Sequence, residues 1–269
     1  WVAEFYGWRI AFLVVGVPGG LLAVVPKLTV LEPIRGMSDP AGTGAQPQPP
    51  LLPTIKALLS NKTFVHIAMG GALTSFVGYG LGQWLPAFFI RLHGMGLAEV
   101  ATYYGLVNGI ASMAGTFLGG TLADRFAKRE QRIYVWLPAA GVLVSFPFYF
   151  AALVVGDWRI AIAILLVPSF LNSLWLGPAF GTIQNIAPQA MRALASAILL
   201  FILNIIGLGF GPFLVGVLSD LLSGSFGEES LRYAIIIATA AYFWAGAHFI
   251  LAGKTLVADL KRASDEAVA

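Results

Sequence analysis

Apolar residues occur along this chain in seven long runs, separated by short stretches of polar or charged residues. A helix needs about 20 apolar residues to cross the hydrocarbon core of a bilayer, and each run reaches that length. No residue in the runs is clearly ionised at mid-depth, and a helix satisfies its own backbone hydrogen bonds in lipid. The pattern therefore predicts an all-α membrane protein with seven transmembrane helices, at residues 8–30, 64–90, 97–123, 133–155, 158–187, 193–222 and 231–253.

One gap between the runs, residues 32–61, differs from the others because it is long and rich in proline. Its prolines are Pro33, Pro40, Pro47, Pro49, Pro50 and Pro53. This composition cannot bury a core, so we expect a flexible linker, with a short interfacial helix at Thr54–Ser60. The chain is then expected to divide into residues 1–31, the linker, a six-helix bundle at 62–254 and a tail at 255–269.

The composition excludes an ordinary soluble domain. The chain is 58% hydrophobic and 11% charged, whereas soluble domains carry about 25% charged residues. It has no cysteine, which excludes disulfides and thiolate metal sites. The net charge of +3 does not indicate a nucleic-acid partner, because basic residues gather in the cytoplasmic loops of membrane proteins. We expect the lipid bilayer as a partner and no cofactor.

Lysine and arginine are distributed unevenly between the two sets of alternate gaps. Twelve of the 16 fall on one side, and Arg9, Arg91, Arg159 and Arg232 fall on the other. The positive-inside rule makes the first side cytoplasmic. We therefore expect a multi-pass protein of a bacterial inner (plasma) membrane, with its linker and C-terminus in the cytoplasm.

Two segments of the last six helices are similar to each other. GTFLGGTLAD ends at Asp124 and GPFLVGVLSD ends at Asp220, and both fit the pattern G-x-F-L-x-G-x-L-x-D. By the count of spans the two copies point in opposite directions, which predicts three helices followed by three inverted helices. The counterpart residues in the second copy are Gly211, Gly216 and Asp220. Chance similarity between two glycine-rich apolar helices is the alternative.

The stretch GTLADRFAKR resembles the cytoplasmic signature of the major facilitator superfamily, G-x-L-A-D-R-x-G-R-K/R, with Ala127 in place of the usual glycine. The matching residues are Gly120, Leu122, Asp124, Arg125, Lys128 and Arg129. GWRIAF near the start resembles the outer end of the family's sixth helix, and APQAMRALASA with GLGFGP resembles its spinster-like branch. The resemblance implies helices six to twelve of a twelve-helix carrier. Residues 1–31 would then be the last helix of the N-terminal half, and helices one to five would be missing partners.

In that family the signature loop latches the cytoplasmic gate. The resemblance implies that Asp124 accepts hydrogen bonds from helix N-terminal amides or pairs with Arg125 or Arg129. The alternative is a solvated positive-inside loop, which accounts for the basic residues better than for Asp124.

The resemblance also implies that the first, second, fourth and fifth of the six helices line a central cavity. Mid-depth polar or aromatic residues on these helices are Tyr79, Gln83, Asn108, Ser112, Asn172, Trp175 and Asn204. A buried amide in lipid is costly without a partner, so such residues face either the cavity or a hydrogen bond to another helix. These spans hold no ionised residue at mid-depth, so the solute is amphipathic or apolar, or its charged partners lie in the missing helices. The resemblance to the spinster-like branch implies a lipid-like solute, whereas other branches of the family carry sugars, organic anions or drugs.

The remaining features concern glycine and histidine. Gly78/Gly82, Gly105/Gly109 and Gly115/Gly119 are pairs that let helices approach closely. Gly207, Gly209, Gly211 and Pro212 interrupt the fifth helix of the six, for gating or for close packing. His66 and His248 are expected at the membrane interface and His93 in an outer loop, and their spacing indicates no metal site.

Three functions fit seven membrane-spanning helices. A secondary carrier, driven by an ion or proton gradient, moves a small-molecule substrate by alternating access. A seven-helix receptor of the retinal type needs a lysine deep in the last helix, but Lys254 comes at its end. An intramembrane enzyme needs a catalytic dyad or metal ligands at depth. The sequence favours the carrier, which is not an enzyme.

Overall fold

The computed structural model describes residues 2–31 and 50–268, and this part of the chain is helical throughout its regular elements. It falls into two units, Trp1–Gln48 and Pro49–Ala269. The first contains α1 (Val2–Tyr6) and α2 (Trp8–Thr29), and no residue of either helix is buried. The α2 helix agrees with the first predicted span. Most of the linker expected at 32–61 lies outside the described residues.

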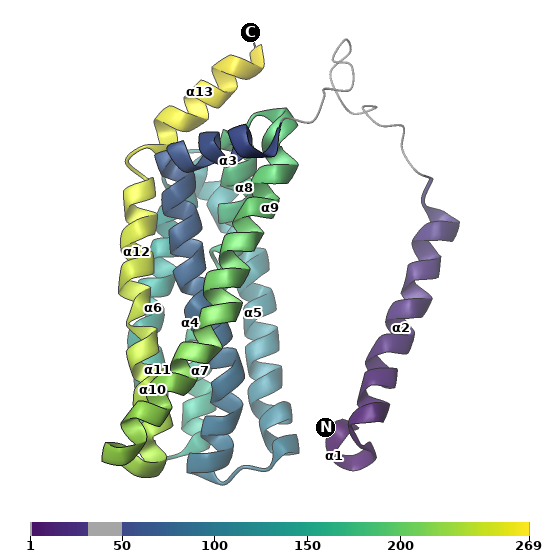
Figure 1. Cartoon of the computed structure of the whole chain (residues 1–269), viewed down its shortest axis with the longest axis vertical. Coiled ribbons are helices and arrows are strands. Elements are labelled where there is room, and N and C mark those ends of the chain that lie inside the picture. The colour runs from purple at the N-terminus through teal and green to yellow at the C-terminus, as the bar shows by residue number, and fades with distance from the viewer. Residues whose placement is uncertain (1, 32–49, 269) are drawn as a thin grey trace. The chain divides into compact units, whose positions relative to one another are not determined.

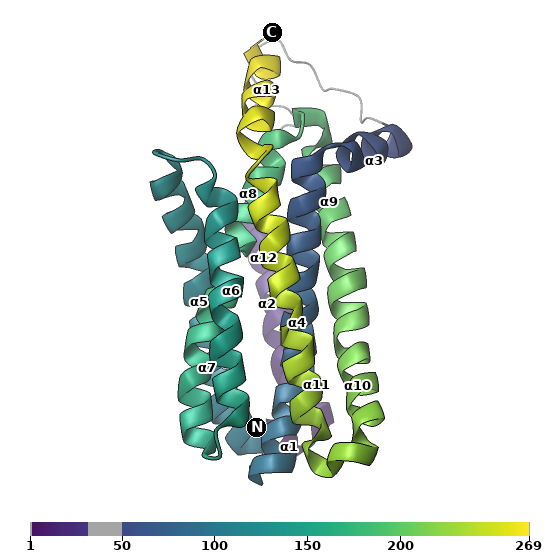
Figure 2. The same cartoon turned by 90° about the vertical axis from the view of Figure 1, so that its left-hand side faces the viewer.

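The second unit is a bundle of long helices (Figures 1 and 2). The α3 helix lies across one end of this bundle, and α13 leaves it at the same end. The helices are α3 (Leu51–Ser60), α4 (Lys62–His93), α5 (Leu97–Ala127), α6 (Ile133–Val154), α7 (Trp158–Asn172), α8 (Leu176–Ile186), α9 (Arg192–Leu203), α10 (Gly211–Phe226), α11 (Ser230–Thr239), α12 (Ala241–Ala252) and α13 (Leu256–Val268).

Six helical stretches in the described residues are long and apolar enough to cross a membrane, namely Trp8–Thr29, Lys62–His93, Leu97–Ala127, Ile133–Val154, Trp158–Ile186 and Gln189–Ala252. The last has 64 residues and contains the two final predicted spans. Between α10 and α11 it turns back on itself (Figure 2), at the short 3-10 turn Gly227–Glu229. The limits of the predicted spans thus agree with helices to within a few residues.

Local capping explains where several helices begin. The side chain of Asn61 accepts a hydrogen bond of 2.8 Å from the amide of Phe64, which caps α4. Asp157 caps α7 in the same way through the amide of Arg159, at 2.7 Å. Each cap satisfies a backbone donor that has no partner within the helix. The interfacial helix expected at Thr54–Ser60 is α3, which begins three residues earlier, at Leu51.

Two predicted spans contain irregular segments. The span at 158–187 is broken by a turn after Asn172, so α7 and α8 are separate helices. The interruption expected near Gly207 is a π-helical segment, Asn204–Phe210, between α9 and α10. π-Helical segments are frequent at functional sites, and both irregular segments lie beside α4.

Glycine allows α5 to pack directly on main chain of its neighbours. A Cβ on Gly115 would collide with the carbonyl oxygen of Phe170 in α7, and one on Gly119 with that of Leu174. A Cβ on Gly109 would meet nothing within 4 Å. The predicted glycine pairs therefore differ in how closely they pack. Gly115/Gly119 lies against the main chain of another helix, whereas Gly109 has free space beside it.

Candidate solute pocket and cytoplasmic gate

The main candidate site is a hollow of about 260 Å³ between α4, the α7–α8 turn and the α9–π-helix segment. It brings together four of the residues predicted from sequence, which are Tyr79, Asn172, Trp175 and Asn204. Gly78, Leu203 and Phe180 also line it. None of its lining residues is charged.

The turn after α7 puts Asn172 and Trp175 in this hollow. The Oδ1 of Asn172 accepts a hydrogen bond of 2.9 Å from the hydroxyl of Tyr242 in α12. Trp175 is only 6% exposed, and its ring lies 6.5 Å from that of Phe249 between centroids. Across the hollow, the Nδ2 of Asn204 donates to the carbonyl of Leu200 in its own helix, at 2.8 Å. In each amide one polar group is therefore already hydrogen-bonded to the protein, namely the oxygen of Asn172 and the nitrogen of Asn204.

The other predicted cavity residues lie elsewhere. Gln83 lines a second hollow of about 480 Å³, beside Trp84 and Pro212. Ser112 in α5 donates at 3.5 Å to the carbonyl of Ser169 in α7, which is the alternative role of hydrogen bonding between helices. Asn108 is half-buried in α5 and lines neither hollow.

Sequence reasoning missed two polar residues that matter here. Tyr242 was not a candidate because α12 belongs to the sixth helix of the bundle, which is not among the four helices expected to line the cavity. Trp84 donates its indole hydrogen to the carbonyl of Pro212 at 2.8 Å. Its ring packs against the side of Gly216 on which a Cβ would lie. A polar side chain in an otherwise apolar span is the only signal that points to either residue.

The signature residues lie at one end of α5. Gly120, Leu122, Asp124 and Arg125 belong to its last two turns, and Lys128 and Arg129 follow it. The Oδ1 of Asp124 accepts a hydrogen bond of 2.9 Å from the hydroxyl of Tyr134, in the first turn of α6. In the part of the chain that the structure describes, no ion pair joins Asp124 to Arg125 or Arg129. Tyr134 is thus a partner of Asp124 that was not predicted, and it reaches the carboxylate from the other side of the turn between α5 and α6.

The proposed repeat residues have parallel contacts. Gly115 packs on the carbonyl of Phe170 in α7, and its counterpart Gly211 packs on the carbonyl of Phe76 in α4. The two glycines therefore let α5 contact the main chain of α7, and α10 that of α4, in the same way. Gly216 meets the ring of Trp84, and Asp220 is exposed in α10.

Histidine forms one unforeseen contact. The Nδ1 atoms of His66 in α4 and His248 in α12 lie 3.0 Å apart. His93 is the last residue of α4 rather than part of a loop, and its ring packs against Phe88 and Phe89. Among the described residues, no three histidine, cysteine or acidic side chains form a group that could hold a metal.

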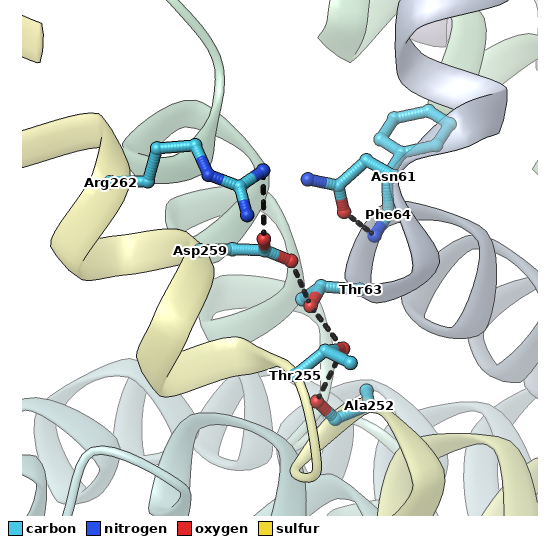
Figure 3. A network of polar contacts seen from close by, with 7 residues as sticks. All are labelled: Asn61, Thr63, Phe64, Ala252, Thr255, Asp259 and Arg262. Atoms are coloured by element: carbon cyan, nitrogen blue, oxygen red, sulfur yellow. Dashed lines mark hydrogen bonds and ion pairs between the residues drawn. The ribbon is translucent and has the colours of Figure 1, made fainter.

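The tail, residues 255–269, is helical as α13 over Leu256–Val268 and is fixed to the start of α4 (Figure 3). Asp259 in α13 accepts from the hydroxyl of Thr63 at 2.6 Å, and Thr63 also contacts the hydroxyl of Thr255 at 2.6 Å. Arg262 approaches the Asp259 carboxylate at 3.6 Å.

Comparison with known proteins identifies the family. The model of the Major Facilitator Superfamily matches residues 1–212. An MFS-type efflux pump of Mycolicibacterium smegmatis is 32% identical over 254 residues, which are 91% of this chain and 56% of that protein. Protein spinster homolog 3 of Danio rerio is 26% identical over 97% of this chain and 56% of its own length.

A solved structure is also similar to this chain in fold and sequence. It is a bacterial homolog of the human lysosomal transporter spinster, in an inward-facing and unoccupied conformation. Its TM-score is 0.78 at 29% identity, over 94% of this chain and 60% of that one. The chain thus spans about half the length of the relatives it matches. It belongs to the major facilitator superfamily of membrane transporters and is spinster-like.

Proposed function

We propose that this chain is the C-terminal part of a secondary carrier that moves a small amphipathic or lipid-like solute by alternating access. The observation behind the proposal is the hollow beside α4, which combines the amides of Asn172 and Asn204 with the rings of Trp175 and Phe180. Its lining is uncharged, so it suits an apolar body with a neutral polar group better than a strongly charged solute. The solute is proposed to enter it from a larger cavity shared with the other half.

The proposed arrangement has seven crossings. Residues 1–31 would be the last helix of the N-terminal half, 32–61 the cytoplasmic linker, 62–254 the C-terminal bundle and 255–269 the cytoplasmic tail. The reversal between α10 and α11 supports counting the stretch Gln189–Ala252 as two crossings. The matching contacts of Gly115 and Gly211 support inverted sets of three helices.

The proposed partners are the lipid bilayer of a bacterial inner membrane and helices one to five of the carrier. The α5 helix supports this, because it exposes apolar side chains along much of its length, including Leu106, Ile110, Met113 and Phe117. In water such a surface would be unfavourable. Coupling to a proton or another ion would depend on carboxylates from those helices, since the hollow itself is lined by uncharged residues.

The test is transport by the full gene product in proteoliposomes, compared with these 269 residues alone. The probes are radiolabelled decyl-chain amphiphiles with neutral, anionic and cationic headgroups. We expect the full protein to take up the neutral amphiphile under an imposed ion or pH gradient, and uptake to stop when the gradient is collapsed. Uptake by the 269 residues alone would overturn the half-carrier assignment. Failure of the full protein to move any of the three would overturn the proposed solute class.

A further inference from the structure

The hydrogen bond between Tyr242 and Asn172 determines which side of the Asn172 amide faces the hollow. Tyr242 is fully buried in α12, and its hydroxyl donates to the Oδ1 of Asn172 at 2.9 Å. The Nδ2 of Asn172 lies on the side of Gly78, 3.5 Å from where a Cβ on that glycine would be. Gly78 lines the hollow, so Asn172 presents an N–H donor there.

Tyr242 itself is held in place. Its ring stacks on that of Tyr149 in α6, with centroids 5.9 Å apart and planes 22° from parallel. Tyr149 is only 4% exposed. The buried stacking of the two rings therefore limits how the Tyr242 hydroxyl can be oriented toward the Asn172 amide.

Asn204 offers the opposite group from the other side of the hollow. Its Nδ2 donates to the carbonyl of Leu200 within the helix, which leaves its Oδ1 as the acceptor available to a solute. The hollow thus includes a donor from Asn172 and an acceptor from Asn204. The rest of its lining combines the hydroxyl side chains of Thr74, Ser75 and Tyr79 with apolar ones such as Leu203 and Phe180.

We propose that Asn172 and Asn204 recognise an uncharged, hydrogen-bonding oxygen of the solute, and that Tyr242 is the positioning residue that fixes the Asn172 donor. A hydroxyl group fits both amides, since it accepts from Asn172 and donates to Asn204. A carbonyl or sulfoxide oxygen fits Asn172 alone. This inference rests on the proposed transport function and specifies the polar group of its solute.

The test uses two probes that differ in one oxygen, decyl methyl sulfoxide and decyl methyl sulfide. The sulfoxide oxygen accepts a hydrogen bond, and the sulfide lacks this acceptor but has the same chain. Binding of each tritiated probe is measured on the full gene product in nanodiscs, for wild type, Asn172→Leu, Tyr242→Phe and Tyr103→Phe. The ratio of the two Kd values is compared between variants, because differences in probe hydration cancel.

One hydrogen bond corresponds to a factor of about ten in affinity. We expect Asn172→Leu to reduce the preference for the sulfoxide about tenfold while sulfide binding stays near wild type. Tyr242→Phe should reduce the preference about threefold, because the freed amide can also turn its oxygen to the solute. Tyr103→Phe is the matched control, since Tyr103 is exposed on α5, and should leave the ratio unchanged.

Three kinds of failure are distinguishable. Saturable binding of both probes with the same ratio in wild type and Asn172→Leu would overturn the inference and leave the proposed amphiphile carrier standing. A loss of preference in Asn172→Leu without any change in Tyr242→Phe would overturn the positioning role. Absence of saturable binding of both probes to wild type would count against the proposed function and the inference together.

Discussion

The hydroxyl of Thr63 donates a hydrogen bond of 2.6 Å to the carboxylate of Asp259, which joins the first turn of the central helix α4 to the tail helix α13 (Figure 3). Thr63 is fully buried, and its hydroxyl also meets that of Thr255. Arg262 lies on the other side of the carboxylate. Because hydrogen bonds to a charged acceptor are stronger than neutral ones, this contact is the main polar anchor of the tail.

Replacing Thr63 with valine should release the tail. Valine has nearly the same shape as threonine, but it cannot donate to Asp259. Losing the donor of a buried polar group costs about 1–3 kcal/mol of stability. We expect trypsin to cleave several-fold faster at Lys261 and Arg262, followed by loss of a C-terminal epitope. Thr102→Val on the exposed surface of α5 is the matched control. Equal cleavage rates in the two variants would show that α13 does not depend on this bond.

The glycine contacts of α5 give a second prediction. Gly115→Ala should strongly destabilise the bundle, because the new methyl group meets the carbonyl of Phe170 and neither backbone can move freely. Overpacking of this kind costs about 1–3 kcal/mol or more. Thermal unfolding in detergent measures the loss. Gly109→Ala, in open space on the same helix, should unfold at the wild-type temperature, and a similar loss in both would point to helix distortion instead.

The sequence allowed the long apolar helices and one of their breaks to be predicted, because both depend on local composition. Length and hydropathy located the helices, and the glycines near Gly207 indicated the interruption that is the π-helical segment. Local pattern could not separate Gly115 from Gly109, since the difference lies in what the neighbouring helix presents.

Contacts between distant residues were the part that sequence reasoning missed. Tyr242 and Asn172 are 70 positions apart, and His66 and His248 are 182 apart. Their pairing follows from how α4, α7 and α12 pack. For the same reason the signature motif located Asp124, but its partner Tyr134 became evident only from the turn geometry.

The Asp124–Tyr134 bond gives a third prediction. If this bond holds the gate turn, Asp124→Asn and Tyr134→Phe should each slow transport several-fold, because one weakens the charged acceptor and the other removes the donor. The double variant should be no slower than the slower single variant, since both changes act on one interaction. Uptake rates are normalised to the amount of protein in the membrane, which should not change. Wild-type turnover in Asp124→Asn would contradict the latch, and multiplied effects would mean that the residues act separately.

The orientation in the membrane gives a fourth prediction, and the absence of cysteine from these 269 residues makes it direct to measure. Gly156 is exposed between α6 and α7, and Ser264 is exposed on α13. Single cysteines at these positions are introduced into the full gene product after any cysteines elsewhere are replaced. An impermeant maleimide should label Gly156→Cys in intact cells, and Ser264→Cys only after permeabilisation.

We expect this result because lysine and arginine are in excess on the side of the linker and tail, and loops rich in these residues face the cytoplasm. The two positions are at opposite ends of the bundle if α6 to α12 cross the membrane as proposed. Labelling of Ser264→Cys alone in intact cells would reverse the orientation. Labelling of both positions would mean an even number of crossings between them, and would contradict counting Gln189–Ala252 as two helices.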